Sequence, residues 1–89
     1  MDLTAVFGSK AQTKFVQYLL EHPTKATTQG FASKMLRVSP STVARVIEPL
    51  RKEGIIVLDE VKQMKVIFLN TESEKVKALL NFYQQVKRL

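Results

Sequence analysis

The spacing of hydrophobic residues changes partway along the chain. From residue 9 to residue 54 they recur every three to four positions, which predicts amphipathic helices. Two short β-branched stretches follow, at residues 55–59 and 64–69, and these predict strands joined by the polar segment 60–63. Helical spacing then returns. The pattern therefore predicts three helices, a β-hairpin and a last helix, all within one small domain.

Capping residues set the expected ends of the first two helices. Ser9 and Gln12 have the spacing of a capping box, and Pro23 is expected to end the first helix soon after His22. Thr27 or Thr28 is expected to cap a second, short helix. The residues expected to face inward from that second helix are Phe31, Ala32, Met35 and Leu36.

The third helix has the clearest signals. Ser39 is a strong N-cap, Pro40 suits the first helical position, and Gly54 suits a left-handed helix end. Pro49 removes one backbone hydrogen bond, so we predict a bend late in this helix. The inward stripe is Val43, Val46, Ile47 and Leu50, which leaves Ser41, Thr42, Ala44, Arg45 and Glu48 facing outward.

The hairpin and the last helix expose more apolar residues than one small domain needs. The hairpin is apolar on both faces, so we expect the last helix or another subunit to cover the second face. Thr71 and Glu74 form a second capping box, which predicts a helix running to Leu89. Its stripe belongs either to the core of the same chain or to a dimer seam, and its heptad-like spacing favours the seam. The expected seam residues are Val76, Leu79, Leu80, Tyr83 and Val86.

Two short helices, a tight turn, a helix capped by Ser-Pro and a hairpin are the parts of a winged helix-turn-helix. The segments VSPSTVARVIEPLRKEGII at 38–56, VKQMKVIFLN at 61–70 and FGSKAQTKFVQYLLEHP at 7–23 resemble small archaeal and bacterial winged-helix transcription regulators, similar to the MarR and ArsR groups in the broad sense. The resemblance implies sequence-specific binding of double-stranded DNA by a homodimer.

The expected fold class is α+β, mainly α, with a three-helix core, a two-stranded hairpin wing and a C-terminal dimerisation helix. Residues 1–70 would form the DNA-binding domain and residues 71–89 the dimerisation helix. Two features depart from the family pattern. Arg37 stands where such proteins often have a glycine, so we expect a turn without a left-handed residue. Lys62 and Gln63 stand where the wing tip often has Gly-Arg, which weakens the case for insertion into a narrow groove.

Charge supports a nucleic-acid partner. The 89 residues include 14 basic and 8 acidic ones, a net charge of +6. Residues 31–54 hold five basic and two acidic residues, so half of the excess lies in the helix-turn-helix. Small polar side chains and an arginine at the start of a helix suit base edges in the major groove. The expected base-reading residues are Ser41, Thr42 and Arg45, and the expected phosphate contacts are Lys34, Arg37, Ser39, Arg51, Lys62 and Lys65.

Other chemistry finds no support in the sequence. There is no cysteine, and a lone histidine, His22, gives no basis for a metal site or a cofactor. No phosphate-binding glycine loop or nucleophile–base set indicates an enzyme, and no apolar run predicts a membrane span or a signal peptide. We therefore expect a cytoplasmic, nucleoid-associated protein. Two alternatives are a protein-interaction module of a replication or transcription assembly, and a plasmid or virus replication or copy-control protein.

Overall fold

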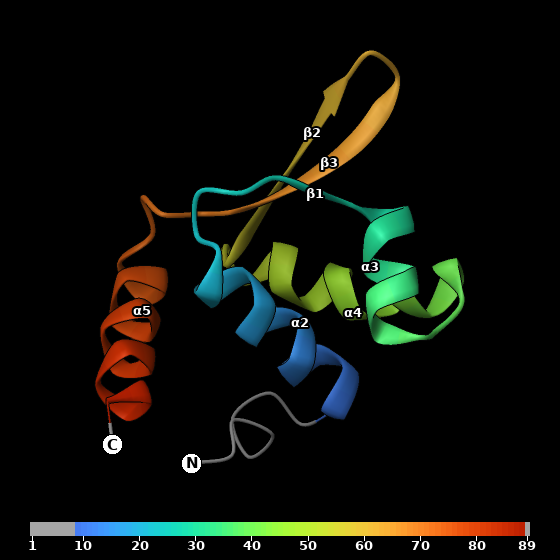
Figure 1. The fold of residues 1–89 in the computed structure, drawn as a ribbon. Helices are drawn as coiled ribbons and strands as arrows, with labels where there is room; N and C mark the ends of the chain where they lie inside the picture. The colour runs from blue at the N-terminus through green and yellow to red at the C-terminus, as the bar shows by residue number, and fades with distance from the viewer. Residues whose placement is uncertain (1–8, 89) are drawn as a thin grey trace.

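The helices and strands follow the predicted order in the computed structural model, which describes residues 9–88 (Figure 1). The sequence-based expectations for Phe7, Gly8 and Leu89 lie outside the described residues. The elements are α2 Lys10–Glu21, β1 Thr27–Thr28, α3 Gln29–Leu36, α4 Pro40–Lys52, β2 Ile56–Val61, β3 Met64–Leu69 and α5 Glu74–Lys87.

The core lies between α2, α3, α4 and the base of the sheet. The predicted stripe of α4 is buried as expected, and Phe15, Leu19 and Ile67 are among the largest side chains that are fully buried. Ser9 caps α2 and Thr28 caps α3, each accepting a backbone N–H three residues on. The prediction for Phe31 is wrong. Its side chain is 47% exposed and packs at the surface against the ring of Tyr18, with ring centroids 5.7 Å apart.

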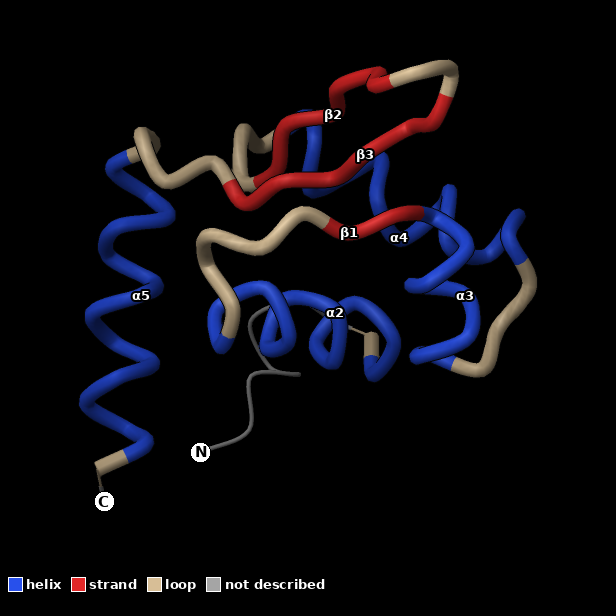
Figure 2. The backbone as a smooth tube through the Cα atoms, turned by 45° about the horizontal axis from the view of Figure 1, so that its top comes forward, coloured by secondary structure: helices blue, strands red, loops and turns tan. Residues whose placement is uncertain are grey.

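The wing is part of a three-stranded antiparallel sheet with the order β1-β3-β2. The predicted hairpin is confirmed, but β1 was not predicted, because two residues are too short to show a strand period. In β1, Thr27 pairs with Ile67 and Thr28 with Val66. The sheet therefore ties the segment before α3 to the wing (Figure 2).

The turn of the wing is tighter than the predicted connection over 60–63. Strand β2 continues to Val61, which pairs with Met64, so only Lys62 and Gln63 form the turn. Both have positive φ angles, 50° and 68°. This is the geometry of a two-residue hairpin turn whose twist matches the strands, usually made by Asn-Gly. Neither residue is of the preferred type, so residues 60–63 carry no signal for a two-residue turn.

The outer face of the wing has no cover within the described chain. Val57, Val61 and Met64 are 45%, 49% and 56% exposed, and all three lie on the face that carries Phe68. Helix α5 lies beside the opposite end of the sheet from the wing tip (Figure 2). The expectation that the last helix covers this face is therefore wrong for the chain by itself.

Helix α5 begins later than predicted and packs on its own chain. Its N-cap is Ser73, which accepts from the N–H of Val76, and not Thr71, which precedes it in an exposed turn. Val76 is fully buried in the core, so it is unavailable to a dimer seam. The Tyr83 hydroxyl donates to Glu21 of α2 at 2.5 Å. Leu79, Leu80 and Tyr83 are partly buried against the same core.

Replacing Tyr83 with phenylalanine should lower the free energy of unfolding by about 1 kcal/mol near neutral pH, because one hydrogen bond is deleted. The hydrogen bond to Glu21, together with burial and the negative charge of Glu21, raises the pKa of Tyr83 to about 12 from its ordinary 10.0. The folded state therefore keeps this proton longer than the unfolded chain does. The hydrogen bond therefore contributes its full stabilisation below about pH 10, and this stabilisation is lost as the pH rises toward about 12.

Urea unfolding of wild type and Tyr83→Phe near pH 7 and near pH 11.5 measures this difference. The difference in free energy of unfolding between the two proteins should be smaller at the higher pH. An equal gap at both pH values would show that the hydroxyl acts through packing and not through its proton.

Candidate nucleic-acid interface

The first turn of α4 holds a cluster of three hydroxyl groups. Ser39 is extended, with φ −69° and ψ 157°, and its Oγ accepts the backbone N–H of Thr42 at 3.3 Å. The same oxygen lies 3.0 Å from Ser41 Oγ and 3.0 Å from Thr42 Oγ1. Pro40 fills the first helical position. The hydrogen bonds of the cap therefore hold the side chains of Ser41 and Thr42, two of the predicted base-reading residues.

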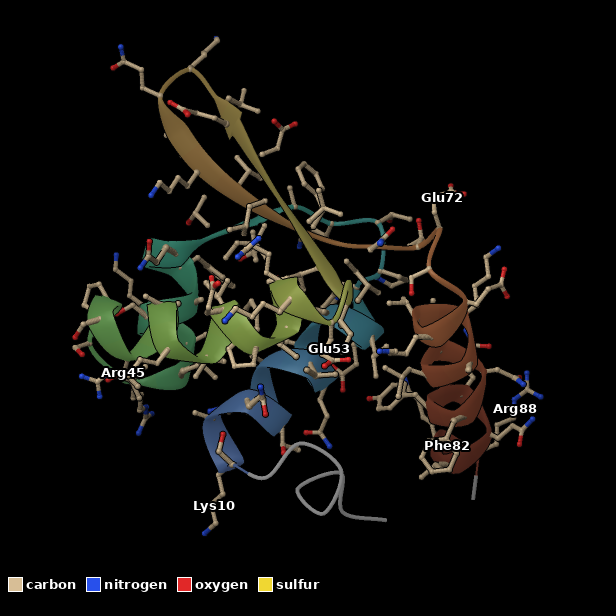
Figure 3. All side chains as sticks on the ribbon, turned by 180° about the vertical axis from the view of Figure 1, so that it is seen from behind. Lys10, Arg45, Glu53, Glu72, Phe82 and Arg88 are labelled. Carbon is tan, nitrogen blue, oxygen red and sulfur yellow. The ribbon has the colours of Figure 1, made fainter. Side chains whose placement is uncertain are left out.

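Arg45 lies one turn further along the same face. It is exposed and forms no ion pair within residues 9–88. Its side chain projects away from the body of the protein, on the side opposite α5 (Figure 3). The helical spacing of Ser41, Thr42 and Arg45 places them on one surface. The structure thus brings together the three predicted base-reading residues, and we call this surface the α4 face.

Helix α4 continues past its internal proline. It is one helix from Pro40 to Lys52, and the chain after Pro49 resumes the helical pattern through the bond from the Glu53 N–H to the Pro49 carbonyl, at 3.0 Å. Pro49 is exposed, so the carbonyl that loses its partner, that of Arg45, lies near solvent. The predicted bend at this point stays a prediction.

Arg51, a predicted phosphate contact, is already engaged by an acidic neighbour. Its Nη2 lies 2.6 Å from Glu48 Oε1 and its Nε donates to Glu48 Oε2 at 3.1 Å. This two-bond pair lowers the pKa of Glu48 and raises that of Arg51, chiefly through the hydrogen bonds. The pair uses two of the five N–H donors of the guanidinium, and it leaves the negative charge of Glu48 beside any phosphate that approaches. Among the predicted phosphate contacts, Arg51 is therefore the least available.

The turn between α3 and α4 is built around a left-handed residue. Arg37 has φ 57° and ψ 44°, so the expectation that the turn avoids this conformation is wrong. The turn is closed by the bond from Val38 N–H to the Ser33 carbonyl at 3.1 Å, and by the Ser33 hydroxyl, which donates to the Val38 carbonyl. These bonds compensate for the strain that an arginine meets where a glycine is usual.

Replacing Arg37 with glycine should raise the free energy of unfolding by about 0.5–1 kcal/mol. Relief of the left-handed strain outweighs the greater freedom of glycine in the unfolded chain. The same change removes an exposed cation beside the α4 face and should weaken duplex binding. Thermal unfolding and a duplex titration measure the two effects, with Lys34→Ala as the control that removes a nearby charge and leaves the backbone unchanged. A variant less stable than wild type would contradict the first expectation.

The remaining predicted phosphate contacts are exposed lysines on α3 and on the wing. Lys34 lies on α3, Lys62 at the wing tip and Lys65 on β3, and none is ion-paired within the described residues. Lys65 also lines a hollow of about 180 Å³ between α4 and the wing, whose other lining residues include Gln29, Ala44 and Glu48. The wing and the α4 face are thus separated by a recess in which both elements present polar groups.

Sequence reasoning missed Gln29. It is the first residue of α3, and its Nε2 donates to the carbonyl of Pro40, the first residue of α4, at 3.0 Å. No local pattern connects residues eleven positions apart, so only the packing of α3 on α4 shows the contact.

We also searched the described residues for a metal site and for a membrane-spanning helix. Residues 9–88 contain no group of three or more metal-ligating side chains. His22 is exposed at the end of α2, where its ring centroid lies 4.9 Å from that of Tyr18. No helix among these residues is long and apolar enough to cross a membrane.

Three helices and an antiparallel sheet whose hairpin projects beside α4 define a winged helix-turn-helix fold. Solved structures confirm this class. The complex of Staphylococcus aureus MepR with DNA is similar over 94% of this chain and 72% of that chain, with a TM-score of 0.71 and 24% identity. MepR is described as a transcription regulator of the multidrug efflux pump MepA; another of its structures covers 90% of this chain and 61% of that chain, with a TM-score of 0.68 and 24% identity.

A second similar protein is the heme sensor PefR from Streptococcus agalactiae, in complex with heme. The likeness covers 88% of this chain and 56% of that chain, with a TM-score of 0.66 and 22% identity. This chain therefore spans about three fifths of the length of these two regulators. No protein-family model and no curated protein matches the sequence. The similarity establishes the fold, and the function has to be argued from the residues of the chain itself.

Proposed function

We propose that this protein binds double-stranded DNA and regulates transcription, with the first two turns of α4 in the major groove. The observation that carries the proposal is the α4 face. Ser41 and Thr42 are short polar side chains held by the cap, and Arg45 is a free guanidinium one turn later. Short polar residues allow a helix to approach base edges closely, and arginine can bond guanine through two atoms.

The cations around this face suit the phosphate backbone. Lys34 and Arg37 flank α4 on the α3 side, and Lys62 and Lys65 flank it on the wing. Ser39 adds a hydroxyl at the helix start. Such contacts fix the register of a protein on a duplex and leave base reading to the α4 face. Arg51 is a weaker candidate, because the carboxylate of Glu48 offsets its charge.

The structural neighbours support the same function. MepR has been solved with DNA, and MepR is a transcription regulator. By analogy, we propose that this protein is a cytoplasmic, nucleoid-associated regulator and not an enzyme. The ligand of PefR is heme. For this chain the proposal is limited to DNA and a second copy of the protein.

Selection of duplexes from a random library, followed by fluorescence-anisotropy titration of an enriched and a scrambled duplex, tests the proposal. We expect enrichment of one sequence and a clear preference for it over the scrambled control. Equal, weak binding to both duplexes, with no effect of salt, would overturn the proposal. That outcome would favour the alternative in which the fold serves as a protein-interaction module.

We also propose a homodimer, in which two α4 helices enter successive major grooves roughly 34 Å apart. The support is the apolar side of α5. Leu79, Leu80 and Tyr83 are only partly buried by their own chain, and Val86 is half-buried without belonging to the residues packed against the core. A second copy would remove these side chains from water, and a domain of this size gains stability from such an interface. The expected target is a palindrome.

Replacing Val86 with aspartate should convert the dimer to monomer, because a buried carboxylate in an apolar seam costs several kcal/mol. Sedimentation velocity measures the change. The control is Gln84→Asp, which places the same charge on an exposed position about half a turn away on the same helix. If both variants remain dimeric, the seam lies elsewhere on the protein.

A further inference from the structure

We infer that Gln29 is a positioning residue that fixes α4 relative to the wing, so that both elements fit one duplex; this rests on the proposed DNA binding. The DNA-facing residues occupy two separate elements. Arg45 lies on α4, and Lys62 and Lys65 lie on the wing. Double-stranded DNA is rigid, so α4 and the wing can both contact it at the same time only if the spacing between them stays fixed.

The segment 27–29 joins these two elements. Thr28 pairs with Val66 of β3, which ties the segment to the wing, and its hydroxyl accepts the N–H of Phe31 at 3.1 Å, which starts α3. The next residue, Gln29, donates to the carbonyl of Pro40 at 3.0 Å. One short stretch of chain therefore holds the wing through its backbone and α4 through a side chain.

Gln29 lies where α4 and the wing share an apolar core but have few polar contacts with each other. It lines the recess of about 180 Å³ between α4 and the wing, where Ala44 and Glu48 lie on one side and Lys65 on the other. It also lines the shallow hollow beneath the wing tip, together with Gln63 and Met64. Within the described residues no direct hydrogen bond or ion pair joins α4 to the wing across this recess.

The bond from Gln29 acts at the most sensitive place on α4. Pro40 is followed immediately by Ser41 and Thr42, so a shift of the first turn moves the base-reading residues directly. The carbonyl oxygen of Pro40 has two lone pairs, and it can accept from Gln29 while it also serves the helix. The bond is neutral and exposed to solvent, so it adds little to overall stability and its main effect is on geometry.

The test is Gln29→Met, which keeps the length and helix propensity of the side chain and removes its amide group. Gln17→Met on α2 is the matched control, because Gln17 is also half-buried and its side chain forms no hydrogen bond within the described residues. The full chain is titrated with the enriched duplex and with a scrambled duplex. Thermal unfolding is recorded in parallel.

We expect Gln29→Met to bind the enriched duplex roughly three- to tenfold more weakly, to bind the scrambled duplex as wild type does, and to unfold at nearly the same temperature. A second measurement compares Arg45→Ala and Lys65→Ala, singly and together, in both backgrounds. Their effects on affinity should be coupled in wild type and close to additive in Gln29→Met.

Several outcomes would overturn the inference. One is unchanged affinity of Gln29→Met for the enriched duplex. Another is equal loss on both duplexes together with a lower unfolding temperature, because that would show a purely structural role. If wild type itself prefers no duplex, the proposed function fails, and this result is distinct from any difference between the two variants.

Discussion

Raising the salt concentration from about 50 to 200 mM should weaken binding of the enriched duplex by a factor of roughly 10³–10⁵. Four of the predicted phosphate contacts in each copy are exposed cations without ion pairs among the described residues, namely Lys34, Arg37, Lys62 and Lys65. A homodimer therefore presents eight, which is within the range of phosphate contacts that produces this loss. The physical cause is the release of counterions condensed on the DNA, which is less favourable when the salt concentration is high.

The slope of log affinity against log salt concentration measures the number of phosphates neutralised. Lys65→Ala should lower that slope by about one for each copy in the complex. Lys10→Ala is the matched control, because Lys10 is an exposed lysine at the start of α2, away from the wing (Figure 3). A slope near zero for wild type would contradict phosphate binding by these residues.

Replacing Arg45 with alanine should cost about 1–3 kcal/mol for each copy, or roughly five- to 150-fold in affinity, if its guanidinium reads a guanine through two hydrogen bonds. Arg45 is well placed for this contact because it is exposed on the α4 face and has no competing carboxylate within residues 9–88. Arg51, six residues later, has such a competitor in Glu48. Arg51→Ala should therefore have a much smaller effect.

Titration of wild type, Arg45→Ala and Arg88→Ala with a panel of single base-pair substitutions distinguishes base reading from general attraction. Arg88 is an exposed arginine after α5 and controls for the loss of one positive charge. Arg45→Ala should lose its preference at one position of the site and keep it at the others. A uniform loss across the panel would assign Arg45 to a phosphate instead.

Strong local signals predicted α4 correctly. Ser39, Pro40 and Gly54 each favour one backbone conformation for a chemical reason that depends only on the residue and its neighbours, and all three have the expected role or φ angle in the structure. The outward placement of Ser41, Thr42 and Arg45 follows from the helical period once the buried stripe is known. The candidate interface on α4 was therefore accessible from the sequence.

The errors occur where bonds to nearby residues or tertiary contacts outweigh the preference of a single residue. Arg37 adopts a left-handed conformation that a lone arginine disfavours, because bonds between Ser33 and Val38 close the turn around it. Phe31 looked like a core residue from its spacing, but it lies at the surface against Tyr18. Thr71 had the spacing of an N-cap, but the chain turns at residues 70–73 and leaves that role to Ser73.

By itself, the sequence determined the order of the helices and of the hairpin strands, the start of α4 and the residues that face outward from it. These features depend on capping, side-chain branching and periodicity, which act over a few residues. Only the tertiary structure decided that Val76 belongs to the core and that Gln29 reaches Pro40 from the foot of the wing. Such pairings depend on where whole elements pack and which rotamers that packing allows, and no local pattern in the chain encodes them.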